Sequence, residues 1–308
     1  MCKFTPIISS LKVLLNGKYL WVAIITYFPD NAVTRRYDMA NTMNISIIGY
    51  GNMAKAIAQG LLQNPAYHLQ VSSPSLPIGQ SHPRCQTHHS NLAILPEADV
   101  LILAVKPIKM AEVLAEIRPQ LRSNLLLISV AAGLSFTWFQ SQLPPDMPLV
   151  RAMPNIAAAC GQSATPLVAN AWVNQTQQDA SLALFSQCGR AIWTTKEADL
   201  DAFTALSGSG LAYIFAFAEA MRQGGITLGL DPTVATTFAV QTLQGAAQLA
   251  TDPTRSLQSL QDSITSKAGT TAAALDVFAE RHLSDIVLSA MQAAVVRSQT
   301  LREELCQD

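Results

Sequence analysis

The feature that most constrains the fold is a short β-branched run that ends at a glycine turn and opens a helix. Residues 44–48 read Asn-Ile-Ser-Ile-Ile, and Gly49 and Gly51 follow at once. Residues 54–63 then carry apolar side chains at helical spacing. This strand, turn and helix predict the first unit of a parallel sheet, because parallel strands need a crossover connection.

The same alternation of strands and helices continues to about residue 198. Residues 98–105 and 125–130 are apolar on both faces, as expected of buried parallel strands. We therefore expect an α/β fold, with a Rossmann-type, mostly parallel sheet domain over residues 44–198. The other predicted strands are residues 68–72, 148–153, 164–168 and 191–195, and a further helix covers residues 113–121.

Strand patterns cease near Asp199, and only helical patterns follow. Charged residues make up 13% of the chain and hydrophobic residues 49%, whereas a typical soluble domain carries roughly 25% charged residues. This composition favours close-packed helices and surface that is hidden between subunits. We expect residues 199–308 to form an all-α domain with surface that packs against another subunit. Its predicted helices cover residues 200–206, 212–224, 234–250, 256–263 and 271–304.

The first 43 residues stand apart from this pattern. Residues 19–28 form an apolar run that is too short to span a bilayer as a helix. Lysines precede the run, but no small-residue cleavage site follows it. We expect residues 1–43 to be a dispensable extension; a targeting segment is the alternative.

The net charge and the cysteine pattern limit the kinds of partner and ligand that the chain can bind. The net charge is −1 and no basic stripe is visible, which argues against nucleic acid. The five cysteines are scattered without a paired motif, so neither a zinc site nor a disulfide framework is indicated. His88 and His89 are adjacent but lack other ligands at suitable spacing, and we expect no metal. A cytoplasmic protein that binds no membrane is expected.

The glycine turn matches the G-x-G-x-x-A form of the dinucleotide-binding fingerprint. Gly49 permits a tight turn, Gly51 lets the backbone approach a pyrophosphate, and Ala54 allows the helix to pack closely on the strand. Asn52 and Met53 lie in the same turn and are predicted cofactor contacts. A purely structural glycine turn is the alternative.

The second predicted strand bears on the choice of cofactor. NAD-binding proteins usually carry a carboxylate at its end for the ribose 2′-hydroxyl, but residues 71–75 contain none. Hydroxyl groups at Ser73 and Ser75 would accept a 2′-phosphate without repulsion. We therefore expect NADPH, with NADH possible; the alternative is that these serines simply make a turn.

Two further segments follow predicted strands at the edge where a cofactor binds in such sheets. In residues 104–107, the candidate contacts are Ala104, Val105, Lys106 and Pro107, and Lys106 is placed to meet phosphate or ribose. In residues 153–155, Met153 and Pro154 offer an apolar wall for the nicotinamide, and Asn155 offers amide hydrogen bonds. A solvated lysine and a core methionine are the alternatives.

A different kind of site is predicted at residues 264–275. Ser266, Gly269, Thr270 and Thr271 stand together just before an alanine-rich helical stretch. A glycine turn at a helix start exposes backbone N–H groups at the positive end of the helix dipole. This arrangement suits a small carboxylate, although an ordinary helix cap has the same residue types.

Taken together, these motifs resemble those of the pyrroline-5-carboxylate reductase family, and the resemblance covers residues 44–300. Residues 151–155 and 206–210 also match motifs of that family. The resemblance implies NAD(P)H-dependent reduction of 1-pyrroline-5-carboxylate to L-proline, by hydride transfer to a cyclic imine. It implies that Ser266, Gly269, Thr270 and Thr271 hold the imino-acid carboxylate, with Thr271 as a positioning and proton-relay residue. It also implies a homodimer of interlocked C-terminal helices, assembled into a higher homo-oligomer.

Two departures from the family pattern and three competing hypotheses accompany the resemblance. Leu211 stands where the family usually has proline, and residues 160–163 depart from a glycine-rich form.

A β-hydroxyacid dehydrogenase would need an acid or base, commonly a lysine, on the helix at residues 211–221, where only Glu219 and Tyr213 are candidates. A general imine reductase and a non-catalytic NADPH-binding regulator are the second and third hypotheses.

Overall fold

The computed structural model describes residues 4–15, 18–29 and 42–306, and Cys2 and Lys3 lie outside them, as do residues 30–41 of the expected extension. The chain divides into two compact units between Thr42 and Met43. Taken by itself, the first unit contains an antiparallel hairpin of β1 (Phe4–Leu15) and β2 (Lys18–Pro29). The apolar run at residues 19–28 lies in β2.

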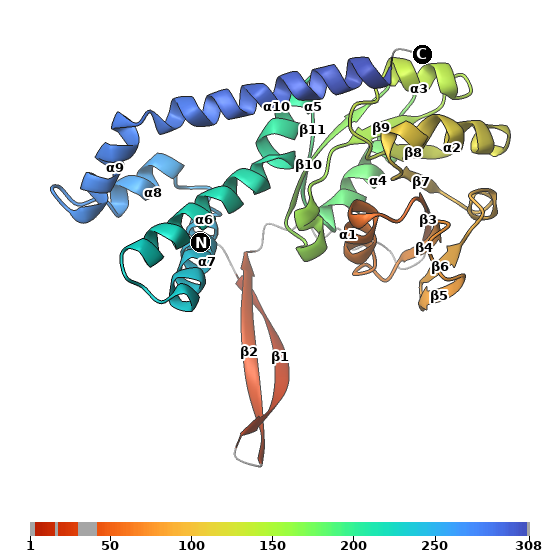
Figure 1. Cartoon of the computed structure of the whole chain (residues 1–308). Coiled ribbons are helices and arrows are strands. Elements are labelled where there is room, and N and C mark those ends of the chain that lie inside the picture. Colours follow the sequence, from red (N-terminus) through yellow and green to blue (C-terminus); the bar gives the residue numbers. More distant parts are fainter. Residues whose placement is uncertain (1–3, 16–17, 30–41, 307–308) are drawn as a thin grey trace. The chain divides into compact units, whose positions relative to one another are not determined.

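Within the described residues, the second unit contains a nine-stranded sheet in the order β11-β10-β9-β8-β7-β3-β4-β6-β5 (Figure 1). The centre of the sheet is fully buried: all four residues of β7 and of β8 are buried, as their apolar sequences predicted. The strands are β3 (Met43–Ile48), β4 (Tyr67–Ser72), β5 (Gly79–His82), β6 (Cys85–His88), β7 (Val100–Leu103), β8 (Leu126–Ser129), β9 (Leu149–Ala152), β10 (Ser163–Ala169) and β11 (Gly189–Trp193).

The prediction of a mostly parallel sheet is confirmed, with two antiparallel pairings that it did not include. β10 runs antiparallel to β9, and β5 runs antiparallel to β6. Only a short 3₁₀ helix, η4 (Ile156–Cys160), separates β9 from β10, whereas a parallel crossover needs a dozen or more residues. The hairpin of β5 and β6 was not predicted, because its two strands are short and their residues are mostly polar.

Helices cover both faces of this sheet. Ile45 and Ile47 of β3 pack in the core that includes α1 (Asn52–Leu61) and α4 (Gln175–Ser186). Ile48 faces the opposite core, which includes α2 (Met110–Ile117) and α3 (Phe136–Gln142). Alternate residues of one strand therefore serve two cores, which makes a three-layer α/β/α arrangement.

From Asp199 onward every regular element among the described residues is helical, as predicted. One prediction was wrong in detail: the helix expected over residues 271–304 is broken at His282, whose φ of 54° lies in the left-handed region and ends the first hydrogen-bond ladder. The helices are α5 (Asp199–Phe203), α6 (Gly210–Thr227), α7 (Pro232–Leu249), α8 (Leu257–Ser263), α9 (Thr270–Glu280) and α10 (Leu283–Leu305), with a π-helical turn at Thr204–Gly208.

Apolar side chains remain exposed on these helices in the single chain. No residue of α6, α9 or α10 is fully buried, and Phe215 and Phe238 are 64% and 67% exposed. One stretch, Asp199–Thr227, is long and apolar enough to cross a membrane by length and composition. Many large apolar side chains exposed on one set of helices favour an interaction face there.

Candidate functional site

The predicted cofactor segments meet at one edge of the sheet. Because β3, β4, β7, β8 and β9 run parallel, their carboxyl ends gather there. The Gly49 N–H donates to the Ser72 carbonyl at 2.8 Å, and the Ala104 N–H donates to the Ile48 carbonyl at 2.9 Å. The glycine turn thus lies between the ends of β4 and β7, as the fingerprint requires.

The two glycines of the turn have different surroundings. Gly49 has a φ of +91°, and a Cβ atom there would lie 2.7 Å from the Ala104 carbonyl oxygen. At Gly51 a Cβ atom would meet nothing within 4 Å, and no side chain caps the helix that Gly51 begins. The first-turn N–H groups of Asn52, Met53 and Ala54 are therefore open to an anion at the positive end of α1.

The serines that follow β4 lie beside this turn. Ser73 is buried, and its hydroxyl lies 3.1 Å from the hydroxyl of the exposed Ser75. The Ser73 N–H donates to the His88 carbonyl at 3.0 Å. Arg84, the nearest cation in sequence, is not available here: its guanidinium donates to the Leu62 carbonyl at 2.6 Å, at the other end of α1.

The segments after β7 and β9 complete the same edge. Lys106 is exposed and directly precedes the 3₁₀ helix η2 (Pro107–Lys109). Met153 is half-buried and Pro154 is buried. The Asn155 amide is already engaged, because it accepts from the Ala157 N–H and donates to the Ser207 carbonyl at 3.0 Å. A contact between Asn155 and the nicotinamide stays a prediction.

A second helix start carries the predicted carboxylate site. Gly269 precedes α9, and no side chain caps the helix. The Gly269 N–H donates to the Ser266 carbonyl at 3.0 Å, and a Cβ atom at Gly269 would collide with the Ser266 hydroxyl. Ala268 has a φ of 59°, which turns the loop sharply toward the helix. The structure thus brings Ser266, Gly269, Thr270 and Thr271 together, and we call them the carboxylate cradle.

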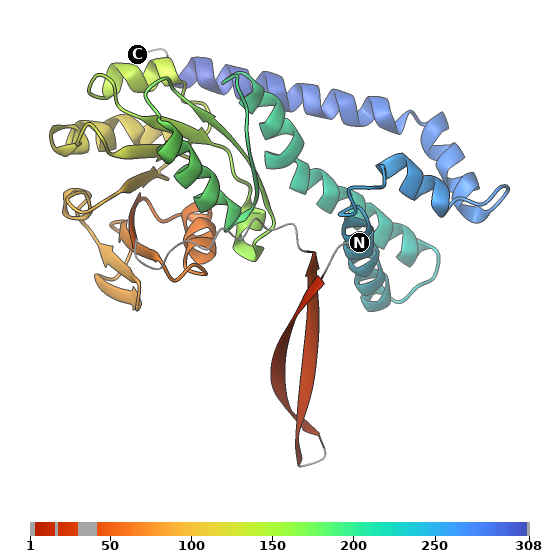
Figure 2. The same cartoon turned by 180° about the vertical axis from the view of Figure 1, so that it is seen from behind.

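One protomer does not bring the cradle to the cofactor edge. At the end of α10, the Cys306 thiol donates to the carbonyl of Gly133, which follows β8. The beginning of α10 lies next to α9 (Figures 1 and 2). A 23-residue helix spans about 35 Å at 1.5 Å per residue. The cradle therefore lies roughly a helix length from the nucleotide-binding edge.

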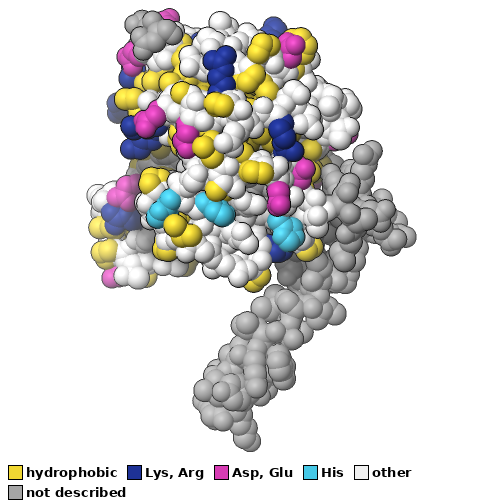
Figure 3. All heavy atoms as spheres, turned by 90° about the vertical axis from the view of Figure 1, so that its right-hand side faces the viewer, with side chains coloured by type: hydrophobic (Ala, Val, Ile, Leu, Met, Phe, Trp, Pro, Cys, Tyr) yellow, Lys and Arg dark blue, Asp and Glu magenta, His cyan; other side chains and the backbone are white. Residues whose placement is uncertain are grey.

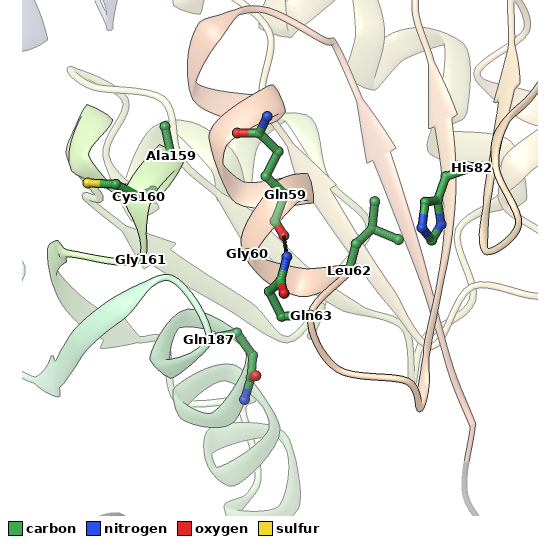
Figure 4. Close-up of a pocket in the computed structure, with 10 residues that line it drawn as sticks. Gln59, Gly60, Leu62, Gln63, His82, Ala159, Cys160, Gly161 and Gln187 are labelled. Carbon is green, nitrogen blue, oxygen red and sulfur yellow. Dashed lines mark hydrogen bonds between the residues drawn. The ribbon is translucent and has the colours of Figure 1, made fainter. Parts of the chain in front are cut away.

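A hollow lies at the other end of α1 and is separate from both sites. Gln59 of α1 and Gln63, which follows the helix, line it together with Cys160, Gln187 and His82 (Figure 4). These residues surround the carboxyl end of α1, whereas Gly51 precedes its amino end.

The face with β5, β6 and α2 shows acidic and basic side chains interspersed, without a patch of one sign (Figure 3).

Metal and thiol chemistry find little support in the described part of the chain. No group of three or more His, Cys, Asp or Glu side chains there is suited to hold a metal ion. Burial raises the pKa of the Cys188 thiol to about 12 and also raises that of Cys85. These thiols stay protonated at neutral pH and are poor nucleophiles.

Sequence reasoning missed one charged contact at the cofactor edge. Glu197, which precedes α5, accepts from Arg151 Nη1 at 2.7 Å and from the Phe136 N–H at 2.6 Å. The two members of the ion pair stand 46 residues apart, so no local spacing signals their contact. The contact joins β9, the start of α3 and the beginning of the helical region.

A dinucleotide-binding turn on this sheet, followed by helices with exposed apolar side chains, is the arrangement expected of a dinucleotide-dependent oxidoreductase whose helical region contacts another subunit. Residues 44–133 match the family model described as NADP oxidoreductase, coenzyme F420-dependent, and residues 197–301 match that of pyrroline-5-carboxylate reductase dimerisation. Pyrroline-5-carboxylate reductases of Vibrio alginolyticus and Pseudomonas aeruginosa are each 36% identical to the chain; the matches cover 84% and 87% of this chain and 97% and 100% of those proteins. The chain belongs to the pyrroline-5-carboxylate reductase family.

Solved structures agree with this membership. A pyrroline-5-carboxylate reductase from Coxiella burnetii is 33% identical, with a TM-score of 0.78 over 85% of this chain and 99% of that one. The Plasmodium falciparum pyrroline carboxylate reductase, solved with NADP bound, is 28% identical, with a TM-score of 0.76 over the same shares.

The helix after residues 206–210 does not offer the acid or base that a β-hydroxyacid dehydrogenase needs. Glu219 accepts from Arg222 at 2.7 Å, and hydrogen bonds from Arg222 and Gln223 lower its pKa to about 2. The carboxylate is therefore ionised and paired at neutral pH, so it is a poor proton donor. The buried Tyr213 hydroxyl has no hydrogen-bond partner among the described residues.

Proposed function

We propose that this protein reduces 1-pyrroline-5-carboxylate to L-proline with NADPH, the last step of proline synthesis. The observation that carries the proposal is that two helices, α1 and α9, begin at a glycine, Gly51 and Gly269, and have no side-chain cap. The first suits a pyrophosphate, and the second suits a small carboxylate. Family membership supplies the reaction that uses both.

The cofactor fits the edge described above, because Gly51 leaves open space and the first turn of α1 has unoccupied donors. Asn52, Met53 and Ala54 would bind the pyrophosphate, and Ser73 and Ser75 would bind the 2′-phosphate. Bound NADPH supplies the hydride that reduces the C=N carbon. Met153 and Pro154, with segment 104–107, would border the nicotinamide and hold its face toward the substrate.

At the cradle, the Gly269 N–H is already bonded to Ser266. The N–H groups of Thr270 and Thr271 would therefore bind the substrate carboxylate, with the Ser266 hydroxyl beside them. Thr271 would direct its hydroxyl to the ring nitrogen, which must hold a proton for the imine carbon to accept hydride. This role is one of positioning and proton relay, since orientation alone lowers such barriers by roughly 7–11 kcal/mol at its favourable limit.

The active site is proposed to form between two protomers. Within one chain the cradle and the cofactor edge lie far apart, so a partner must supply one of them. The exposed apolar side chains of α6, α7 and α10 give the dimer a surface to bury, and the same burial explains Asp199–Thr227 without a membrane. A higher homo-oligomer built from these dimers is the expected assembly.

A cytoplasmic location is proposed on the state of the thiols. Among the described residues, the four cysteines Cys85, Cys160, Cys188 and Cys306 are all free. Free thiols at every described cysteine suit a reducing compartment.

The test is NADPH oxidation by the purified protein with 1-pyrroline-5-carboxylate, with proline identified by mass spectrometry. Unsubstituted 1-pyrroline is the matched comparison, because it lacks only the carboxylate. We expect turnover of the acid and little of the parent imine. Equal turnover of both would favour a general imine reductase, and NADPH binding without turnover would favour a regulator.

A further inference from the structure

Two carboxylates in a five-residue segment point to opposite parts of the molecule. Glu197 binds Arg151 of β9 and the first N–H of α3, at 2.7 and 2.6 Å. Asp201, four residues later, accepts from Ser298 Oγ at 2.8 Å and pairs with Arg302 Nη2 at 2.9 Å, both on α10. We call residues 197–201 the junction, because they connect the last strand to the helices.

Each ion pair has one deeply buried member and one half-buried member. The Arg151 side chain is 5% exposed and its partner Glu197 is 27% exposed; Asp201 is 10% exposed and Arg302 is 29% exposed. Burying charges is costly, and apolar replacements of such pairs are often as stable or more stable. Stability alone therefore gives a weak reason for two partly buried pairs in a chain with few charges. A fixed geometry, enforced by directional charged hydrogen bonds, gives a better one.

Each pair holds an element that borders a proposed site. Arg151 lies two residues before Met153, which is part of the proposed apolar wall for the nicotinamide. Phe136 begins α3 directly after the loop that follows β8, and a Cβ atom at Gly133 in that loop would touch Leu305 at the end of α10. The opposite end of α10 leads to α9 and the cradle. The junction thus links the cofactor edge to the helix that carries the substrate site.

We propose that Glu197 and Asp201 are positioning residues that fix the orientation of the helices relative to the cofactor edge. In the dimer this orientation sets how closely a substrate held in one protomer's cradle approaches the nicotinamide bound by the other. The proposal rests on the proposed function, since it concerns the geometry of that hydride transfer. It assigns neither residue a contact with the reacting atoms.

The test compares Glu197→Gln and Asp201→Asn with the control Glu304→Gln. Glu304 also pairs with an arginine, Arg297 at 2.8 Å, but both lie exposed on α10 and join no second element. The readouts are kcat, KM, NADPH affinity and the primary isotope effect with NADPH deuterated at the transferred hydrogen. All are measured on protein that elutes from size exclusion at the position of the wild-type assembly.

We expect kcat to fall roughly 10- to 100-fold in both junction variants, since small misplacements of reacting groups cost this much. The isotope effect on kcat should rise toward its intrinsic value, while NADPH affinity stays within about twofold of wild type. The control should match wild type in every readout. A variant that only lost folded protein would keep the wild-type isotope effect.

The outcomes separate the two proposals. Wild-type protein without imine reduction would refute the proposed function itself. Active wild-type protein, with junction variants that keep both kcat and the isotope effect, would overturn the positioning role. If one variant does not fold, the other still decides, because each carboxylate holds a different element.

Discussion

Gly49 packs directly against the backbone of Ala104, and no side chain fits between them: a Cβ atom at Gly49 would lie 2.7 Å from the Ala104 carbonyl oxygen. The glycine also has a φ of +91°. We expect Gly49→Ala to lower the free energy of unfolding by about 1–3 kcal/mol, because it adds a clash to a strained conformation. Urea denaturation measures this loss, and wild-type stability would show that the turn relaxes freely.

Gly51 gives the contrasting case in the same turn. A Cβ atom there meets no protein atom within 4 Å, so Gly51→Val should keep the wild-type stability to within about 1 kcal/mol. The new side chain would instead fill the space proposed for the pyrophosphate, and NADPH binding should be lost. Fluorescence titration with NADPH decides: a normal dissociation constant would move the cofactor away from this turn.

Thr271 is predicted to act on the substrate alone. Thr271→Val keeps the shape of the side chain and removes the hydroxyl, so kcat should fall and KM for the imine acid should rise, each by roughly 10-fold. NADPH affinity should not change. The control is Thr300→Val, because Thr300 lies in a helix as Thr271 does but outside the cradle; its hydroxyl donates to the Val296 carbonyl at 3.0 Å. Equal kinetics in the two variants would remove Thr271 from the site.

Much of the fold could be read from local patterns. β7 and β8 were predictable because an apolar run of four residues flanked by helices fits a buried parallel strand. The break at His282 was not, since neither glycine nor proline marks it. The strand β10 was predicted, but its antiparallel direction was not, because direction depends on the connection and on pairing with β9, and neither is a property of the strand's own sequence.

The candidate site divides in the same way. Gly51 and Thr271 were predictable because each belongs to a motif within a few residues of a helix start. The contact of Arg151 with Glu197 was not, because it joins residues distant in sequence through the tertiary fold. We propose that the cradle reaches the cofactor only in a dimer. The residue pattern of one chain does not show which parts of two chains come together.

Ala268 tests the shape of the carboxylate cradle. Its φ of 59° is left-handed, a conformation that costs an L-residue roughly 1–2 kcal/mol and a β-branched residue more. Ala268→Val should therefore shift the loop and raise KM for the imine acid, while NADPH affinity stays unchanged. Ala268→Gly adopts the same φ without strain and should keep the wild-type KM. If the valine variant also keeps it, the loop does not bind substrate.

The Cys188 thiol predicts a loss of stability at alkaline pH. Burial raises its pKa from 9.0 to about 12, so the folded state keeps the proton that the unfolded state releases above pH 9. The stabilisation is complete below about pH 9 and is lost as pH rises toward 12, by up to ~1.4 kcal/mol per unit. The Cys188→Ala variant lacks this proton, so its unfolding free energy should fall less steeply between pH 9 and 11. Parallel curves for the two proteins would contradict the assignment.

Residues 1–42 are predicted to be dispensable for catalysis. They form a compact unit of their own, and the second unit begins at Met43, where β3 starts. Every residue proposed to bind cofactor or substrate lies in the second unit, and the family models match only residues from 44 onward. A chain that begins at Met43 should therefore keep the wild-type kcat, KM and melting temperature of the enzyme. Loss of the dimer or of solubility on truncation would show instead that the hairpin contributes to the assembled fold.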